Sequence, residues 1–145
     1  MTDLSQFENR KKRILIVEDD QDVAGLMRVI LRKNGYDVAV SENGKAGLAL
    51  SSRHRPDAIL LDLNMPEMGG FDFLKHRHDF PDLGTIPVIV LTASRRPRDI
   101  ERAIGLGAVD YVTKPVEYEA LMLCLEKHVP SPYYTPPRPA VITWN

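Results

Sequence analysis

From residue 14 onward, short apolar runs alternate with segments that have helical periodicity. Five apolar runs, at 14–17, 37–40, 58–61, 87–91 and 109–112, predict buried strands. Most of them are continuous rather than alternating, which is typical of strands covered on both faces. The alternation predicts a (βα)5 chain of the α/β class, in which helices cover both faces of a doubly wound, five-stranded parallel sheet.

The intervening segments predict five helices. In the first, Val23, Met27, Ile30 and Leu31 recur on one face, and Asn34-Gly35 supplies a C-terminal stop. The others are expected at about 44–54, 70–78, 97–106 and 117–127. The expected strand order is 2-1-3-4-5, and such sheets bind ligands beyond the carboxyl ends of their strands. Functional residues should therefore follow the strands directly.

Composition narrows the class of protein. The 145 residues are 43% hydrophobic and 27% charged with a net charge of −1, which fits one globular domain and gives no support to direct nucleic-acid binding. No apolar run approaches the ~20 residues of a membrane span. The single cysteine, Cys124, suits a reducing compartment, so we expect a cytoplasmic protein with Cys124 as a small core residue. The expected organisation is a flexible segment 1–12, a domain 13–129 and a proline-rich tail or linker 130–145.

Polar residues follow four of the five predicted strands. They are Glu18-Asp19-Asp20, Asp62 with Asn64, Thr92-Ala93-Ser94, and Thr113-Lys114-Pro115. Several carboxylates at one edge of a sheet are costly unless a cation lies among them, and Mg²⁺ prefers such oxygen ligands. No zinc site is expected, because we expect no cysteine and histidine pair at metal-ligand spacing. Asp20 or Gln21 is expected to cap the first helix, and Asp20 is expected to cap it or to face solvent rather than to bind metal.

Four strings in order resemble the receiver domains of two-component response regulators. They are ILIVEDD (14–20), LLDLNMPEMGG (60–70), LTA (91–93) and GAVDYVTKP (107–115), and the resemblance, which includes stand-alone chemotaxis-type regulators, covers 14 to about 128. It implies a flavodoxin-like fold in which Asp62 is the phosphoacceptor. It also implies that Glu18, Asp19, Asp62 and the backbone carbonyl of Asn64 form a Mg²⁺ site, and that Thr92 and Lys114 contact the phosphoryl oxygens.

The resemblance further implies a switch and its partners. Phosphorylation would draw Thr92 inward and move Tyr111, altering the face of the fourth helix, fifth strand and fifth helix, through which a homodimer could also form. Asn64 and Ser94 would tune the phosphoryl lifetime, and Lys114-Pro115 would be cis. The donor would be a sensor histidine kinase or histidine phosphotransfer protein, and the output a downstream protein or a fused domain. Catalysis would be limited to self-phosphorylation and self-dephosphorylation.

Three alternatives compete with this hypothesis. A haloacid dehalogenase-type enzyme would carry a second acid at position 64, where this chain has Asn64. A nucleotide-binding Rossmann domain would need a glycine-rich loop after the first strand. A receiver-like docking module that has lost phosphorylation usually lacks one of the acids, the threonine or the lysine. In the loop after Asp62, Gly69-Gly70 is expected to permit a positive φ before the third helix.

Overall fold

A computed structural model describes residues 10–65 and 68–134. All five predicted strands and all five predicted helices are present. The elements are β1 (Arg13–Val17), α2 (Gln21–Lys33), β2 (Asp37–Ser41), α3 (Gly44–His54), β3 (Ala58–Asp62), α4 (Gly70–His76), the 3₁₀ turns η1 (Arg77–Asp79) and η2 (Leu83–Thr85), β4 (Val88–Thr92), α5 (Pro97–Gly105), β5 (Asp110–Thr113) and α6 (Tyr118–His128). The strands form one parallel sheet in the order β2-β1-β3-β4-β5, so the predicted topology is confirmed.

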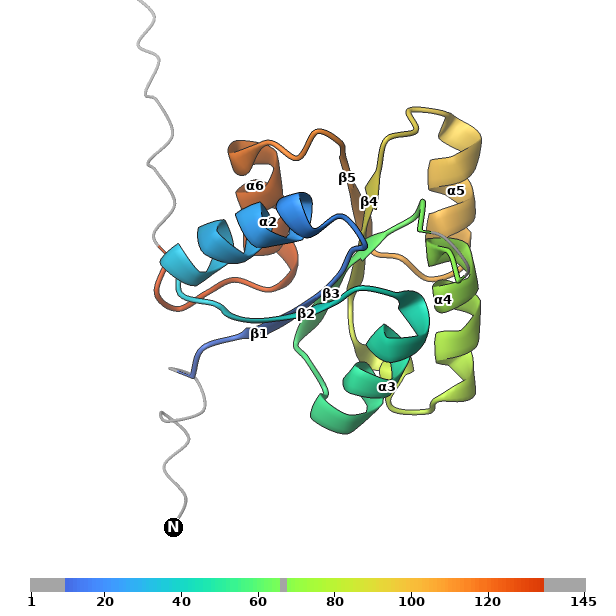
Figure 1. Cartoon of the computed structure of the whole chain (residues 1–145), viewed down its shortest axis with the longest axis horizontal. Coiled ribbons are helices and arrows are strands. Elements are labelled where there is room, and N and C mark those ends of the chain that lie inside the picture. Colours follow the sequence, from blue (N-terminus) through green and yellow to red (C-terminus); the bar gives the residue numbers. More distant parts are fainter. Residues whose placement is uncertain (1–9, 66–67, 135–145) are drawn as a thin grey trace, which may run out of the picture.

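The helices cover the two faces of the sheet as separate layers. Helices α2 and α6 lie on one face, and α3, α4 and α5 lie on the other (Figure 1). One apolar cluster joins α2 and α6 to the sheet through side chains such as Met27, Leu31 and Leu121. A second cluster on the opposite face includes Phe73 and Leu74. Every residue of β3 and β4 is buried, which explains why these strands appear in the sequence as continuous apolar runs.

Local signals set the ends of most helices. Asp20 caps α2 as expected, because its carboxylate accepts hydrogen bonds from the amides of Asp22 (2.9 Å) and Val23 (3.2 Å). Gly35 has a φ of +89° directly after this helix. The helix predicted at 70–78 is α4, and it is shorter than predicted. It ends at His76, where the chain tightens into η1. There the buried Arg77 donates to the carbonyls of Ile86 and Gly107 at 3.0 Å each, which turns it inward.

The packed part of the chain continues through Tyr134, past the boundary expected at 129. The hydroxyl of Tyr36, which is 1% exposed, donates to the carbonyl of Val129 at 2.8 Å. Ser131 is buried, and Tyr134 packs against the cluster beneath α2 and α6. The expected N-terminal segment, apart from residues 10–12, and the remainder of the proline-rich segment lie outside the described residues. None of the helices in the described part of the chain is long and apolar enough to cross a membrane.

Candidate functional site

The polar residues predicted to gather at one edge of the sheet do so. Asp62 is the last residue of β3 and pairs in register with Leu91, and Thr92 at the end of β4 pairs with Thr113 at the end of β5. Glu18 follows β1, and Lys114 follows β5. Because the strands are parallel, these termini meet at the carboxyl edge of the sheet, where the strand order predicts a ligand site.

The ammonium of Lys114 joins the two buried acids of this edge. Its Nζ atom lies 2.9 and 3.1 Å from the carboxylate oxygens of Glu18 and 3.3 Å from Oδ1 of Asp62. Glu18 is 1% exposed and Asp62 is 2% exposed, whereas the Lys114 side chain is 21% exposed. The Lys114-Pro115 peptide is cis, as expected. Among the described residues, the Lys114 ammonium therefore faces two buried carboxylates.

The pKa values of Glu18 and Lys114 reflect burial first and the neighbouring charges next. Burial raises the pKa of Glu18 to about 7, the negative charge of Asp62 adds to the rise, and the hydrogen bonds from Lys114 only partly oppose it. For Lys114, burial alone would lower the pKa, but the hydrogen bond to Glu18 and the charges of Asp62 and Glu18 raise it. The Lys114 ammonium therefore stays charged, whereas the ionised form of Glu18 is disfavoured at this edge.

The donor atoms of this edge fit a hard divalent cation. Carboxylate oxygens of Glu18, Asp19 and Asp62 all lie within 4.8 Å of one another, and Asp19 is the exposed member of the three. Oxygen-only donors, one of them open to solvent, suit Mg²⁺, which keeps several of its waters. The amide of Asn64 donates to Oδ1 of Asp62 at 3.1 Å and holds the next part of the loop against the acid. The role of the Asn64 carbonyl as a ligand stays a prediction.

The loop after β4 is tied together by side-chain hydrogen bonds. Thr92 is fully buried, and its hydroxyl oxygen accepts a hydrogen bond from the Ser94 amide at 3.0 Å. The Ser94 hydroxyl donates to Oδ2 of Asp99 in α5 at 2.6 Å and accepts from the Arg96 amide at 3.2 Å. The sequence alone does not single out Asp99. It reaches Ser94 only because it lies in the first turn of α5, which begins at Pro97.

Tyr111 lies on β5 with its side chain directed away from the core. It is 41% exposed, whereas its neighbour Val112 is buried. An aromatic ring in this position, on the last strand of the sheet, has room to change its rotamer. Its movement on phosphorylation stays a prediction.

The positive φ expected for the Gly69-Gly70 turn is wrong. Gly69 has a φ of −71° and caps α4, and the glycines with positive φ among the described residues are Gly35 and Gly107. Gly70 is required for a different reason, which is a close approach of two backbones. A Cβ atom on it would lie 2.6 Å from Cα of Leu63 and 2.8 Å from the carbonyl oxygen of Asp62. The pattern of glycines was visible in the sequence, but the packing behind it was not.

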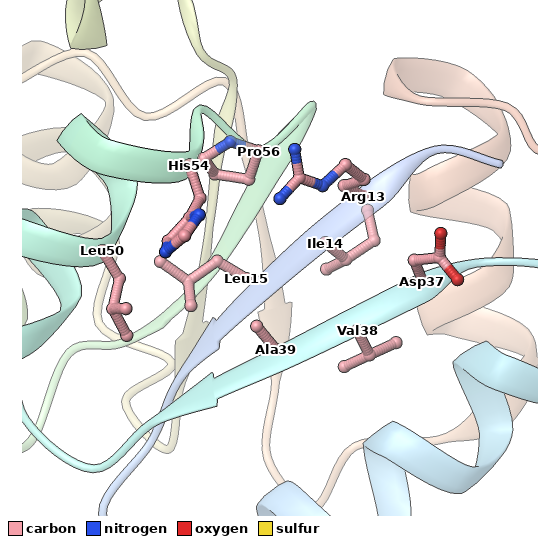
Figure 2. Close-up of a pocket in the computed structure, with 9 residues that line it drawn as sticks. All are labelled: Arg13, Ile14, Leu15, Asp37, Val38, Ala39, Leu50, His54 and Pro56. Atoms are coloured by element: carbon pink, nitrogen blue, oxygen red, sulfur yellow. The ribbon is translucent and has the colours of Figure 1, made fainter. Parts of the chain in front are cut away.

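One well-formed hollow lies elsewhere in the described domain. It has a volume of about 340 Å³, and Figure 2 shows it at the amino ends of β1 and β2, where Arg13 and Asp37 flank it and His54 of α3 closes one side. It shares no residue with the carboxylate edge. Two other hollows border that edge, one lined in part by Lys114 and one in part by Glu18.

Comparison with known proteins agrees with this geometry. The family model described as the response regulator receiver domain matches residues 14–126. The chain belongs to this family. Protein PilH of Pseudomonas aeruginosa is 36% identical over 110 residues, which span 76% of this chain and 91% of PilH.

Two solved structures show the same fold. The chemotaxis protein CheY4 of Vibrio cholerae has a TM-score of 0.78 and 28% identity, with 82% of this chain and 99% of that chain covered. The receiver domain of the sensor histidine kinase PA1611 from Pseudomonas aeruginosa, which was crystallised with a magnesium ion in its active-site cleft, has a TM-score of 0.75 and 29% identity, with 81% and 97% covered. This chain is thus a receiver domain of the two-component response regulators.

Proposed function

We propose that this receiver domain is switched by phosphorylation of Asp62 in the presence of Mg²⁺. The observation that carries the proposal is the position of the Lys114 ammonium, between the buried carboxylates of Glu18 and Asp62 at the carboxyl edge of the sheet. A docking module would have no use for a lysine held among buried acids. A phosphoryl-transfer site needs a nucleophile and fixed positive charge at this distance.

The chemistry follows from the groups present. A carboxylate oxygen of Asp62 attacks the phosphorus atom, the bond to the donor nitrogen or oxygen breaks, and the electron pair leaves with the donor. Lys114 balances charge on the phosphoryl oxygens, and the Thr92 hydroxyl donates a hydrogen bond to one of them. Mg²⁺, held by Glu18, Asp19, Asp62 and the Asn64 carbonyl, would supply further positive charge. Hydrolysis of the acyl phosphate by water returns the free carboxylate.

The switch depends on the hydrogen bond that Thr92 makes now. Its hydroxyl oxygen is engaged by the Ser94 amide, so a turn toward a phosphoryl group on Asp62 would release the loop between β4 and α5. Tyr111 on the adjacent strand then moves inward. The affected face of α5, β5 and α6 carries exposed apolar side chains, including Ile104 (45% exposed), Tyr111 (41%) and Leu123 (76%). We propose this face as the binding surface for a protein target or a second copy.

The phosphoryl donor in this proposal is a sensor histidine kinase or a histidine phosphotransfer protein in the cytoplasm. The structural neighbour from PA1611 is itself part of a sensor histidine kinase, which supports such a partner class. Asn64 and Ser94 set the lifetime of the phosphoryl group, because they lie beside the phosphoacceptor and the switch threonine. The Ser94 hydroxyl is held by Asp99 at 2.6 Å, so its position is fixed relative to α5.

The proposal is tested by phosphorylation with acetyl phosphate, read by intact mass. We expect one phosphoryl adduct that requires Mg²⁺, disappears in Asp62→Asn and persists in Asp72→Asn, a matched change at an exposed acid of α4. Beryllofluoride should then change the fluorescence of the tyrosines in the wild type but not in Asp62→Asn. If no adduct forms under any of these conditions, the chain is a phosphorylation-independent docking module.

A further inference from the structure

A second cluster of metal-binding side chains lies at the opposite end of β5 from Lys114. Asp110 is the first residue of β5, and Cys124 and His128 lie on α6, which packs against this strand (Figure 1). The ligand atoms of the three side chains all lie within 4.8 Å of one another. Nε2 of His128 is 2.8 Å from Oδ2 of Asp110. None of these residues belongs to the proposed phosphorylation site.

The helix places two of the three donors side by side. Cys124 and His128 are four residues apart, so they project from the same face of α6, as paired ligands on one helix do in zinc enzymes. The sequence carries this pair at an i, i+4 spacing, so the expectation that no cysteine and histidine lie at ligand spacing is wrong. The third donor comes from a strand fourteen residues before Cys124 in the chain, and the fold alone brings it to the helix.

We propose that Asp110, Cys124 and His128 form a binding site for a transition-metal ion of the zinc type. A thiolate, an imidazole and a carboxylate are the three kinds of ligand that zinc uses, and three protein ligands leave a fourth position open. The side chains of Asp110 and His128 are 27% and 17% exposed, so the ion and a water molecule can reach the cluster from solvent. Cys124 is 7% exposed and closes the inner side.

The geometry requires only a small adjustment. Ligand atoms of a tetrahedral zinc site lie roughly 3.3 to 3.8 Å apart. The carboxylate and imidazole, now 2.8 Å apart, would separate by less than about 1 Å. The widest separation in the cluster, which is at most 4.8 Å, would close by about the same amount. Side-chain rotations on a strand and a helix that are already in contact can provide both movements.

The protons of the site balance on binding. Without metal, burial together with the charge of Asp110 raises the pKa of the Cys124 thiol to about 12, so the thiol is protonated. Burial alone would raise the pKa of Asp110, but hydrogen bonds from His128, the Tyr111 amide and Cys124 hold it below its usual value. An incoming M²⁺ ion takes the thiolate and the lone pair of a neutral imidazole. The thiol proton is released to solvent, and the proton that Nε2 now donates to Asp110 passes through solvent to Nδ1, which leaves the Nε2 lone pair for the metal.

Cobalt is the probe, because Co²⁺ replaces zinc and its bond to a thiolate absorbs in the near ultraviolet. We would titrate the full chain with Co²⁺ in excess Mg²⁺, so that the acids near Lys114 are already occupied. The expected result is a charge-transfer band that saturates at one equivalent and is displaced by Zn²⁺. Cys124→Ser should abolish the band, and Asp110→Asn should weaken Zn²⁺ affinity at least tenfold. His54→Ala, a change at an exposed histidine of α3, should leave both unchanged.

The wild-type spectrum decides the proposal even if a variant folds poorly. Absence of the band at saturating Co²⁺ would overturn it, and so would a band that persists in a folded Cys124→Ser protein. The same titration of Asp62→Asn separates this site from the other. Loss of stoichiometric Zn²⁺ binding in Asp62→Asn but not in Cys124→Ser would place the ion at the carboxyl edge of the sheet and refute the site at Asp110. Neither outcome depends on whether Asp62 is phosphorylated.

Discussion

The two adjacent glycines before α4 offer a matched test of how the phosphoacceptor strand is held. Gly70 donates its amide hydrogen to the carbonyl of Leu63 at 3.1 Å, so the start of α4 lies directly against the end of β3. An added Cβ on Gly70 would lie 2.6 Å from Cα of Leu63 and 2.8 Å from the carbonyl oxygen of Asp62. Both of these contacts are with backbone atoms, which cannot swing away as a side chain does. Gly70→Ala must therefore push the helix and the strand apart.

The size of the effect follows from the contact distances. Carbon atoms pack at about 3.5 to 4.0 Å, so a 2.6 Å approach demands a separation of about 1 Å. Over-packing of this kind costs about 1–3 kcal/mol of unfolding free energy. Because Asp62 ends the displaced strand, the reacting carboxylate moves too, and a shift of about 1 Å can lower a reaction rate by roughly a hundredfold. We expect Gly70→Ala to lose both stability and phosphorylation rate.

Gly69→Ala is the control. Its Cβ would lie 3.5 Å from the Leu63 carbonyl oxygen, which is ordinary contact, and its φ of −71° suits alanine. Alanine lowers the entropy of the unfolded chain, which stabilises the protein, but it caps the helix less well than glycine, which destabilises it. The expected change in unfolding free energy is therefore within about 0.5 kcal/mol. Urea unfolding followed by circular dichroism gives the stabilities, and intact mass after acetyl phosphate gives the rates. Equal stability and equal rates in the two variants would refute the close approach at Gly70.

Three further predictions concern the metal and Tyr36. Mg²⁺ at ten times its dissociation constant should raise the unfolding free energy of the wild type by about 1.4 kcal/mol, as measured by urea unfolding. Asp62→Asn should lose most of this gain. An equal gain in both proteins would place the ion elsewhere. Tyr36→Phe removes the buried hydrogen bond to Val129 and should cost about 1–3 kcal/mol, and a neutral result would mean that this carbonyl finds another donor. Burial raises the pKa of Tyr36 from 10.0 to about 12, and the charge of Glu126 adds to the rise. The contribution of the neutral Tyr36 hydroxyl to stability is therefore complete below pH 10 and is lost as the pH rises toward 12. Stability measured from pH 9 to 12 should fall less steeply in Tyr36→Phe than in the wild type.

Much of the fold was predictable because the sheet is covered on both faces. Strands such as β3 and β4 must then be apolar at every position, and this produces runs that stand out from the helical periodicity around them. The end of the third helix was not predictable in the same way. No glycine or proline follows Gly70 before His78, but the buried guanidinium of Arg77 binds the carbonyls of Ile86 and Gly107. Tertiary hydrogen bonds decide that boundary, and they have no local signal.

The carboxyl-edge site was predictable for a related reason. Parallel strands with short connections bring their ends together, so a residue's place after a strand is enough to locate it, as for Glu18, Asp62 and Lys114. The sequence could not predict the hydrogen-bond partner of each side chain. The engagement of Thr92 by Ser94, and the tie from Ser94 to Asp99, depend on the path of a loop. In the Asp110 cluster, the i, i+4 pair of Cys124 and His128 stands in the sequence, but the third donor lies on β5, which meets α6 only in the fold.

The same four-residue strand links the two proposed sites. Asp110 begins β5 and contacts α6, whereas Lys114 follows β5 and contacts Glu18 and Asp62. Between them, Tyr111 carries its exposed ring on the face proposed to bind partners, and its amide donates to Oδ1 of Asp110 at 2.8 Å. In the described sheet β5 pairs with β4 alone, so it is held from one side and by its two polar ends. If both proposals hold, β5 is the element that ion binding and phosphorylation share, and the exposed Tyr111 lies on it between the two sites.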